Sequence, residues 1–149
     1  AADNNLISSK VLSTVRTRGD DITVVGSSNW LNISVINFES YFDMGMILYA
    51  PDYCSRDTEF YSDFRTKYIS RHKRNPSNLA EKGYDLMLFM GNSLYQYGKY
   101  FQTEWSEKSY MPGYLTTGYN YQNANYNQLV PILNFGKEGL ELIYENEEE

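Results

Sequence analysis

Hydrophobic side chains recur at helical spacing over several stretches of the chain. The pattern predicts helices over about residues 5–18, 36–42, 58–74 and 79–97. In the last of these, residues 86–90 are apolar on nearly every side, so we expect that helix to be buried on more than one face. A chain with this many amphipathic helices needs a sheet or other helices against which to pack.

Short apolar runs alternate with the helical stretches. Residues 22–25 form a β-branched run that ends at Gly26, and residues 46–49 form a second run that Pro51 stops. Polar residues follow both runs, at 27–33 and at 52–57. A helix followed by a short buried strand and a polar turn is typical of α/β proteins.

The C-terminal part of the chain predicts a β-hairpin. Residues 129–135 and 140–144 are apolar runs on either side of Gly136-Lys137-Glu138-Gly139. Pro131 favours an edge or a bulge for the first of these strands, because proline cannot donate a ladder hydrogen bond. The predicted fold class is therefore α/β, a Rossmann-like lobe with short parallel strands, flanking helices and a C-terminal β-hairpin.

We expect residues 1–149 to form a single α/β lobe of a larger protein, because only two short strands precede the hairpin. Residues 102–127 have little periodicity and are rich in tyrosine and asparagine, so we expect a long irregular segment within the lobe. Such segments are often functional. Tyrosine supplies rigid contact area and asparagine adaptable hydrogen bonds, so residues 110–126 resemble a recognition surface and suit glycan stacking. The alternative, a long ordered loop wrapping the lobe, is slightly favoured.

Composition excludes several function classes. The net charge is −6, from 13 basic and 19 acidic residues, so we expect no nucleic-acid partner. No apolar run approaches the ~20 residues of a membrane-spanning helix. Cys54 and His72 are the only residues of their kinds, which excludes an intrachain disulfide and any metal site with two histidines or several cysteines. We expect no cofactor, and a buried, unreactive Cys54.

Three segments, taken in order, resemble the C-terminal lobe of type I periplasmic binding proteins, the Venus-flytrap proteins of the branched-chain amino-acid binding family. They are ITVVGSSNW at 22–30, GMILYAPDY at 45–53, and FRTKY, RNPS and AEKGYD between 64 and 85. The resemblance covers about residues 5–100. With the tyrosine- and asparagine-rich segment it is similar to a variant in Bacteroidetes-type envelope proteins, some of which carry a peptidoglycan-binding LysM domain.

The resemblance implies the C-terminal part of a two-lobed protein, a substrate-binding component of an ABC transporter that closes on a small polar ligand together with a partner lobe. The ligand-binding residues it implies are Ser27, Ser28, Asn29, Trp30, Tyr53 and Tyr84. Amino-acid binders of this family place a carboxylate in the first loop, and this loop has none, which weighs against an amino acid and leaves a sugar open. Each residue also has a structural reading: a polar strand-to-helix connection for 27–30, and half-buried packing for the two tyrosines.

Two function classes follow from this resemblance. The first is a non-catalytic solute-binding lobe in the periplasm or cell envelope of a Gram-negative bacterium. The alternative is an envelope module that binds a protein partner or lies near peptidoglycan, and that keeps the fold without transport. An enzyme is disfavoured, because the sequence has no nucleophile elbow and no phosphate-binding loop.

Overall fold

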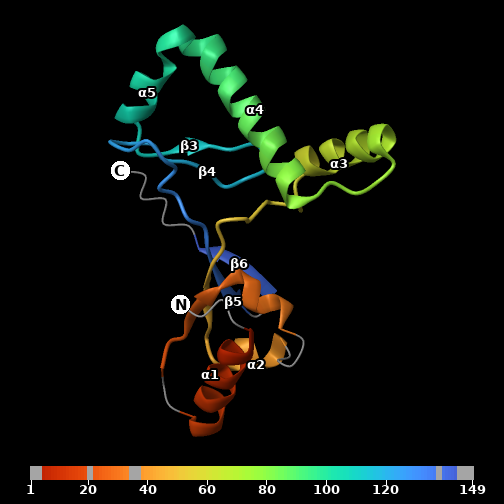
Figure 1. Ribbon diagram of the computed structural model, residues 1–149, viewed down its shortest axis with the longest axis vertical. Helices are drawn as coiled ribbons and strands as arrows, with labels where there is room; N and C mark the ends of the chain where they lie inside the picture. The colour runs from red at the N-terminus through yellow and green to blue at the C-terminus, as the bar shows by residue number, and fades with distance from the viewer. Residues whose placement is uncertain (1–4, 20–21, 34–37, 137–138, 144–149) are drawn as a thin grey trace. The chain divides into compact units, whose positions relative to one another are not determined.

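The computed structural model describes residues 5–19, 22–33, 38–136 and 139–143 (Figure 1). The chain divides into two compact units. The first comprises Ala1–Pro51 and Val130–Glu149 and is called the sheet unit here; the second, Asp52–Leu129, is called the helical unit.

The sheet unit contains a four-stranded sheet with the order β1-β2-β5-β6. The pair β1 and β2 is parallel, whereas β5 is antiparallel to both β2 and β6. Its elements are α1 (Asn5–Arg18), β1 (Val25–Ser27), the 3-10 helix η1 (Ser28–Asn32), α2 (Phe38–Asp43), β2 (Ile47–Tyr49), β5 (Ile132–Gly136) and β6 (Gly139–Ile143).

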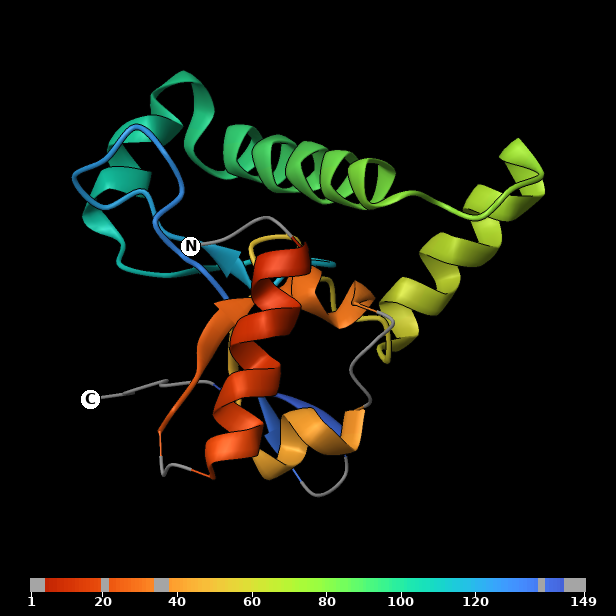
Figure 2. The ribbon, with the colours of Figure 1, turned by 60° about the horizontal axis from the view of Figure 1, so that its bottom comes forward.

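The core of the sheet unit is apolar. Leu48 on β2, Met46 just before it and Leu12 of α1 are all fully buried. Tyr41 of α2 stacks on Phe135 of β5, with ring centroids 5.4 Å apart. Figures 1 and 2 both show α1 lying next to α2. Burial of these side chains is what holds the short strands together.

The helical unit is built around α4. It contains α3 (Glu59–His72), α4 (Asn78–Tyr97), the 3-10 turn η2 (Gly98–Tyr100), α5 (Phe101–Glu107) and the hairpin strands β3 (Met111–Pro112) and β4 (Gly118–Tyr119). Gly98 ends α4 with φ +64° and ψ −154°, a backbone conformation that is accessible almost only to glycine. The chain then returns through α5 beside α4 (Figure 1).

Aromatic rings form much of the core of the helical unit. Phe89 of α4 stacks on Trp105 of α5 and on Tyr119 of β4, with centroid distances of 4.8 and 4.1 Å. A second cluster joins Tyr61 and Phe64 of α3 to Leu115 of the β3–β4 hairpin. Stacked rings combine a large buried area with a preferred geometry, so they fix how these elements pack.

The predicted fold class is confirmed. The sheet unit has the parallel pair, the flanking helices and the terminal hairpin, in which Gly136 pairs with Gly139; the predicted turn residues 137–138 lie outside the described residues. The helices expected over 5–18, 58–74 and 79–97 are α1, α3 and α4. The described part of the helix expected over 36–42 is α2, and none of the described helices has the length and apolarity needed to cross a membrane.

Four local predictions are wrong. β1 begins at Val25, so most of the run at 22–25 lies outside the strand. The strand after Pro131 is interior, between β2 and β6, because the proline precedes its first ladder residue. Residues 86–90 are not buried on several faces: Phe89 is buried, whereas Met87 is 70% exposed. The segment 102–127 contains α5 and the β3–β4 hairpin and is less irregular than expected.

Candidate functional site

The carboxyl ends of β1 and β2 lie together at one edge of the sheet unit. The parallel register pairs Ser27, the last residue of β1, with Tyr49, the last residue of β2. The loop that follows β1 is η1, in which Asn29 is exposed and Ser28 partly exposed. Ligands of open α/β sheets bind outside the carboxyl ends of strands, so this edge is a candidate ligand site.

Two of the predicted ligand residues have structural roles at this edge. The buried Ser27 hydroxyl accepts a hydrogen bond from the backbone N–H of Asn29 at 3.3 Å and caps η1. The Trp30 indole lies so close to Gly26 that a Cβ added there would come within 2.4 Å of the ring. The Trp30 carbonyl oxygen accepts a hydrogen bond from the Tyr41 hydroxyl at 2.7 Å. Of the four predicted ligand residues in this segment, Ser28 and Asn29 are therefore the two whose side chains have no such structural contact in the loop.

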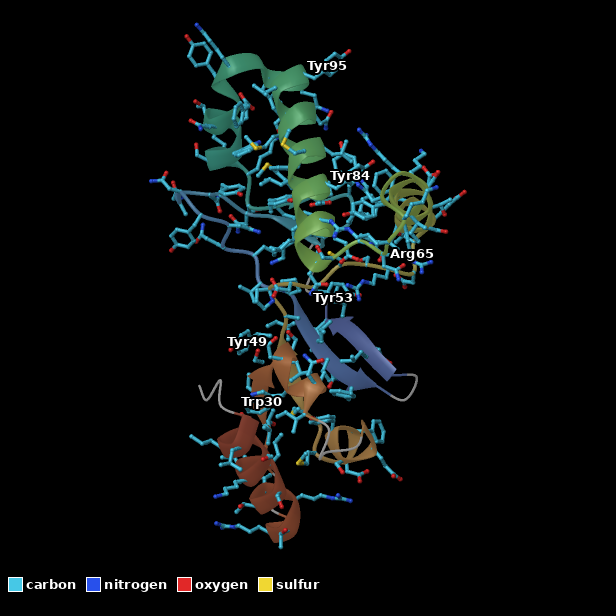
Figure 3. All side chains as sticks on the ribbon, turned by 45° about the vertical axis from the view of Figure 1, so that its right-hand side comes forward. Trp30, Tyr49, Tyr53, Arg65, Tyr84 and Tyr95 are labelled. Carbon is cyan, nitrogen blue, oxygen red and sulfur yellow. The ribbon has the colours of Figure 1, made fainter. Side chains whose placement is uncertain are left out.

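The other two predicted residues, Tyr53 and Tyr84, belong to the helical unit (Figure 3). Tyr53 is partly buried in the connection that precedes α3. Tyr84 lies on α4, where its ring packs against Phe64 with a centroid distance of 4.5 Å and against Phe60 at 6.5 Å. This packing agrees with the structural reading of Tyr84, although 38% of the residue is exposed.

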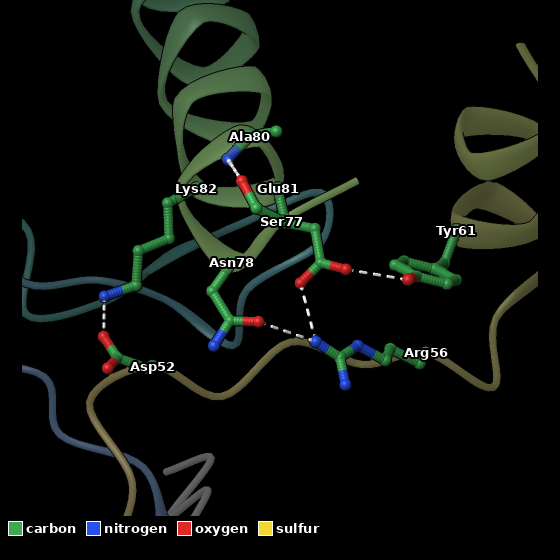
Figure 4. Close-up of polar contacts among 8 residues, drawn as sticks. All are labelled: Asp52, Arg56, Tyr61, Ser77, Asn78, Ala80, Glu81 and Lys82. Atoms are coloured by element: carbon green, nitrogen blue, oxygen red, sulfur yellow. Dashed lines mark hydrogen bonds and ion pairs between the residues drawn. The ribbon is translucent and has the colours of Figure 1, made fainter. Parts of the chain in front are cut away.

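The AEKGYD motif contains a buried carboxylate, Glu81 of α4, which accepts hydrogen bonds from two side chains (Figure 4). One Glu81 oxygen accepts from the Tyr61 hydroxyl at 2.8 Å, and the other accepts from the Arg56 guanidinium at 2.9 Å. Arg56 also donates to the side chain of Asn78. The contact to Glu81, after burial, raises the pKa of Tyr61 above its ordinary 10.0.

Glu81 does not take part in capping the N-terminus of α4. The N-cap of α4 is Ser77, whose hydroxyl accepts a hydrogen bond from the N–H of Ala80 at 3.3 Å. Glu81 turns instead toward Arg56 and Tyr61 (Figure 4). A buried carboxylate gains more from a cation and a hydroxyl than from the solvated N-cap amide.

A second buried carboxylate, Asp85, lies one turn further along α4 and is completely inaccessible to solvent. Its Oδ1 accepts hydrogen bonds from the N–H groups of Tyr114 at 2.6 Å, Leu115, and Thr116 at 3.3 Å. Its Oδ2 accepts from the hydroxyls of Thr116, at 2.7 Å, and Tyr119. Five donors replace the water that the carboxylate loses on burial, and they bind the β3–β4 hairpin to α4.

The same contact defines the state of Tyr119. Burial, and then the hydrogen bond donated to Asp85, raise the pKa of the Tyr119 hydroxyl far above its ordinary 10.0. The hydroxyl therefore stays protonated and remains a donor. The hydrogen bonds to the Glu81 and Asp85 carboxylates thus come from protein donors, and they hold α4 against the neighbouring segments of the helical unit.

Cys54 is buried, as predicted. Burial, together with the negative charges of Glu81 and Asp85, raises the pKa of its thiol to about 11 from an ordinary 9.0. A thiol with so high a pKa is protonated near neutral pH and is a poor nucleophile. His72, at the end of α3, is exposed and packs its ring against Tyr68 with a centroid distance of 4.4 Å.

Two asparagines of the tyrosine- and asparagine-rich segment form hydrogen bonds to the backbone of the same segment. The side chains of Asn120 and Asn127 are used within the segment: Asn127 accepts from the N–H groups of Asn120 and Leu129, and Asn120 accepts from that of Gln122. These bonds order the chain between β4 and the sheet unit's β5. These bonds agree with the alternative of an ordered loop, and a role of the segment in recognition stays a prediction.

Sequence reasoning missed Tyr49, Glu81 and Asp85. Tyr49 has no polar neighbour in sequence that would mark it, and only the β1–β2 register places it opposite Ser27. Glu81 and Asp85 were quoted in the family-like motif without a role, although their spacing of four residues on one helix face was a usable signal. Across the ranges that the structure describes, no three His, Cys, Asp or Glu side chains are grouped so that they can hold a metal ion.

No protein family model and no curated protein matches this sequence. One solved structure similar to this chain is an ABC transporter substrate-binding protein from Desulfitobacterium hafniense in complex with Leu. The TM-score is 0.46 and the identity 12%, over 91% of this chain and 40% of that chain. This chain thus spans less than half the length of that protein.

Proposed function

We propose that this chain is a non-catalytic ligand-binding lobe of a solute-binding protein of periplasmic type. It binds a small polar ligand in a cleft that a partner lobe completes, in the periplasm or envelope of a Gram-negative bacterium. The observation that carries the proposal is the parallel register of β1 and β2, which places the polar η1 loop and Tyr49 at the same sheet edge. The order of the family-like motifs supports it.

The chemistry of this edge favours an uncharged polar group. Asn29 offers a donor and an acceptor, and Ser28 offers a hydroxyl. The residues 27–32 contain no acidic or basic side chain, so the loop supplies no counter-charge for an ammonium or carboxylate group. A small sugar or polyol fits this set better than a free amino acid. The roles of Tyr53 and Tyr84 as ligand contacts stay predictions.

A test can use the fact that the chain has two tryptophans, Trp30 in the sheet unit and Trp105 in the helical unit. The full-length protein is labelled with 5-fluorotryptophan and titrated with a panel of small sugars and amino acids. Binding at the sheet edge shifts the Trp30 fluorine signal. Asn29→Ala lowers the affinity about threefold to tenfold, because one or two hydrogen bonds are lost.

Asn32→Ala is the matched control. Asn32 is an exposed asparagine at the far end of η1, and its replacement should leave the affinity within about twofold. A ligand that binds with equal affinity to the wild type and to Asn29→Ala overturns the site. A folded protein that binds no member of the panel overturns the solute-binding function.

A specific observation favours the alternative, an interaction module. Along α4 the apolar side chains at 79, 86, 87, 90 and 94 form one stripe, and Leu79 and Met87 are 82% and 70% exposed. Exposed apolar stripes mark protein–protein contacts more often than scattered apolar residues do. On this alternative the stripe contacts a protein of the cell envelope.

The alternative is tested by photo-crosslinking in cells, with a benzophenone residue at position 87 or at position 95. Tyr95 is 90% exposed on a different face of α4 and serves as the control. A defined crosslinked species from position 87 that is absent from position 95 supports the interaction module. Equal products from the two positions contradict it.

A further inference from the structure

The helical unit contains an open hollow of about 720 Å³ that the sheet-edge site does not use. Helix α5 contributes Gln102 and Trp105 to its lining, and the ordered loop after β4 contributes Tyr121, Asn123, Asn125 and Tyr126. This volume is within the range of small-molecule sites in proteins, about 300–1,000 Å³. The hollow belongs to one unit and is described by the side chains of that unit alone.

The aromatic part of the lining is held rigidly. Tyr121 stacks on Trp105, with ring centroids 5.0 Å apart and ring planes 18° from parallel. The Trp105 indole N–H donates to the Ser93 hydroxyl at 3.0 Å, and its ring lies against Phe89. Trp105 therefore cannot turn without breaking a buried hydrogen bond, and Tyr121 presents a flat face of fixed orientation.

Four carboxamide side chains line the hollow, and one of them, that of Gln128, donates a hydrogen bond to the Gln122 carbonyl oxygen at 2.6 Å. Among the residues that the structure describes, the side chains of Gln102, Asn123 and Asn125 make no hydrogen bond to protein, in contrast to Asn120 and Asn127. A carboxamide offers two donors and an acceptor, and can satisfy hydroxyl groups that both donate and accept. A flat aromatic face beside unused amides matches a molecule with one apolar face and a rim of hydroxyl groups.

None of the residues lining the hollow carries a charge. An anionic or cationic ligand would lose its hydration without gaining a counter-charge. A purely apolar ligand would cover the amides and leave them unpaired, which also costs free energy. A neutral saccharide avoids both penalties, because the C–H face of a sugar ring can lie on Tyr121 while its hydroxyls meet the amides.

We propose that this hollow, between α5 and residues 121–128, is a binding site for a neutral oligosaccharide. The site is separate from the sheet edge and does not depend on the function proposed above. The stack of Tyr121 on Trp105 positions a sugar ring, Tyr126 covers it, and Gln102, Asn123 and Asn125 bind its hydroxyl groups.

The test is a titration of the 5-fluorotryptophan-labelled full chain with cellotetraose, maltotetraose and chitotetraose, each to about 10 mM. At least one of these probes is expected to shift the Trp105 signal and to leave the Trp30 signal unchanged. Tetragalacturonate, a charged saccharide of the same length, is expected to bind at least about tenfold more weakly, because the lining has no cation to pair with it.

Variants then locate the site. Tyr126→Ala changes a residue that is 70% exposed, so it leaves the fold intact, and it is expected to weaken binding about threefold to tenfold. The double variant Asn123→Ala with Asn125→Ala is expected to weaken binding about tenfold. The matched controls are Tyr95→Ala and Asn92→Ala, both exposed on α4 and outside the hollow, and their affinities should stay within about twofold.

Three results would overturn the proposal. The first is a folded protein whose Trp105 signal no neutral probe shifts. The second is binding that keeps its full affinity in both Tyr126→Ala and the asparagine double variant. The third is a ligand that shifts the Trp30 fluorine signal without shifting the Trp105 signal. Such a ligand would bind at the sheet edge and not in the hollow.

Discussion

The sheet unit and the helical unit bury different kinds of side chain. The sheet unit packs Leu12, Leu48 and Leu133 around short strands, and its core side chains are mostly aliphatic. The helical unit buries the carboxylates of Glu81 and Asp85 beside a set of stacked aromatic rings. One unit is held together mainly by the removal of apolar surface from water, and the other adds a directed hydrogen-bond network.

Helix α4 shows how a buried carboxylate network changes which face of a helix is buried. Its buried face carries Glu81, Asp85, Phe89 and Ser93, spaced four residues apart, whereas four of the five residues of its apolar stripe are exposed. Hydrophobic patterning alone assigns the burial of this helix to the wrong face. A carboxylate can replace an apolar side chain in a core when donors from another segment reach it, as those of residues 114–119 reach Asp85.

The largest expected effect tests the network of the helical unit. Asp85→Ala removes the acceptor of five hydrogen bonds and leaves the N–H groups of residues 114–116 without it. We expect the free energy of unfolding to fall by about 4 kcal/mol. Urea denaturation, followed through the Trp105 fluorine signal, measures the loss.

The control for this variant is Asp63→Ala, which removes an exposed carboxylate paired with Lys67. It should leave the free energy of unfolding almost unchanged, because solvent screens an exposed ion pair. Asp85→Asn should also destabilise the unit, because its amide NH₂ would face the donors on residues 116 and 119. A loss below about 1 kcal/mol for Asp85→Ala would show that the network adds little and would remove the contrast between the units.

The next effect tests the apolar core of the sheet unit. Leu48 on β2 is fully buried, and Leu48→Ala is expected to lower the free energy of unfolding by about 3 kcal/mol, from lost transfer free energy and the remaining cavity. The Trp30 fluorine signal reports the transition. Leu140→Ala on β6, where the side chain is 42% exposed, should cost less than half as much. Equal losses at both positions would contradict a core centred on β2.

The titration of Cys54 has a smaller effect and depends on pH. The thiol pKa is about 11 in the folded chain and 9.0 ordinarily, so between pH 9 and 11 the unfolded chain releases a proton that the folded chain keeps. The stability is unaffected below pH 9 and falls as the pH rises through this window, by about 2 kcal/mol at its upper end.

The contribution of Cys54 is measured as the difference between the wild type and Cys54→Ala, since Tyr61 and Tyr119 shift in the same direction in both proteins. Thermal unfolding midpoints at pH 8 and at pH 11 give the comparison. The fall in midpoint should be larger for the wild type. If both proteins lose the same amount, the burial of Cys54 does not govern its titration.

The smallest effects come from two glycines, one in each unit. A Cβ at Gly26 would clash with the Trp30 ring, so Gly26→Ala should destabilise the sheet unit by about 1–2 kcal/mol. A Cβ at Gly83, inside α4, meets no atom within 4 Å, so Gly83→Ala should stabilise the helical unit by about 0.5–1 kcal/mol. Urea denaturation of the two variants measures both changes. If the two substitutions changed the free energy of unfolding in the same direction, the packing described for Trp30 or for α4 would be contradicted.

The candidate site could be predicted from the sequence only in part. The pattern 22–30 located the loop after β1, and this loop does lie at the carboxyl edge of a parallel pair. It did not distinguish Asn29, which is exposed, from Ser27, which caps η1. Exposure and capping depend on the backbone conformation of the loop. Residue types alone do not define that conformation.

The hollow was even less accessible to sequence reasoning. Composition marked residues 110–126 as suited to recognition, but it treated all the asparagines alike. The structure separates Asn127, which holds the loop, from Asn123 and Asn125, which line the hollow. That separation depends on which backbone amides lie within reach of each side chain.

The sequence by itself determined the α/β class, the places of α1, α3, α4 and the terminal hairpin, and the absence of paired histidines or cysteines. These follow from periodicity, turn residues and composition, which are local properties of a chain. Only the tertiary structure decided that α4 buries Glu81 and Asp85 and exposes Met87. Those choices depend on donors about 20 to 34 residues away in the chain, and no local pattern records which distant groups will meet.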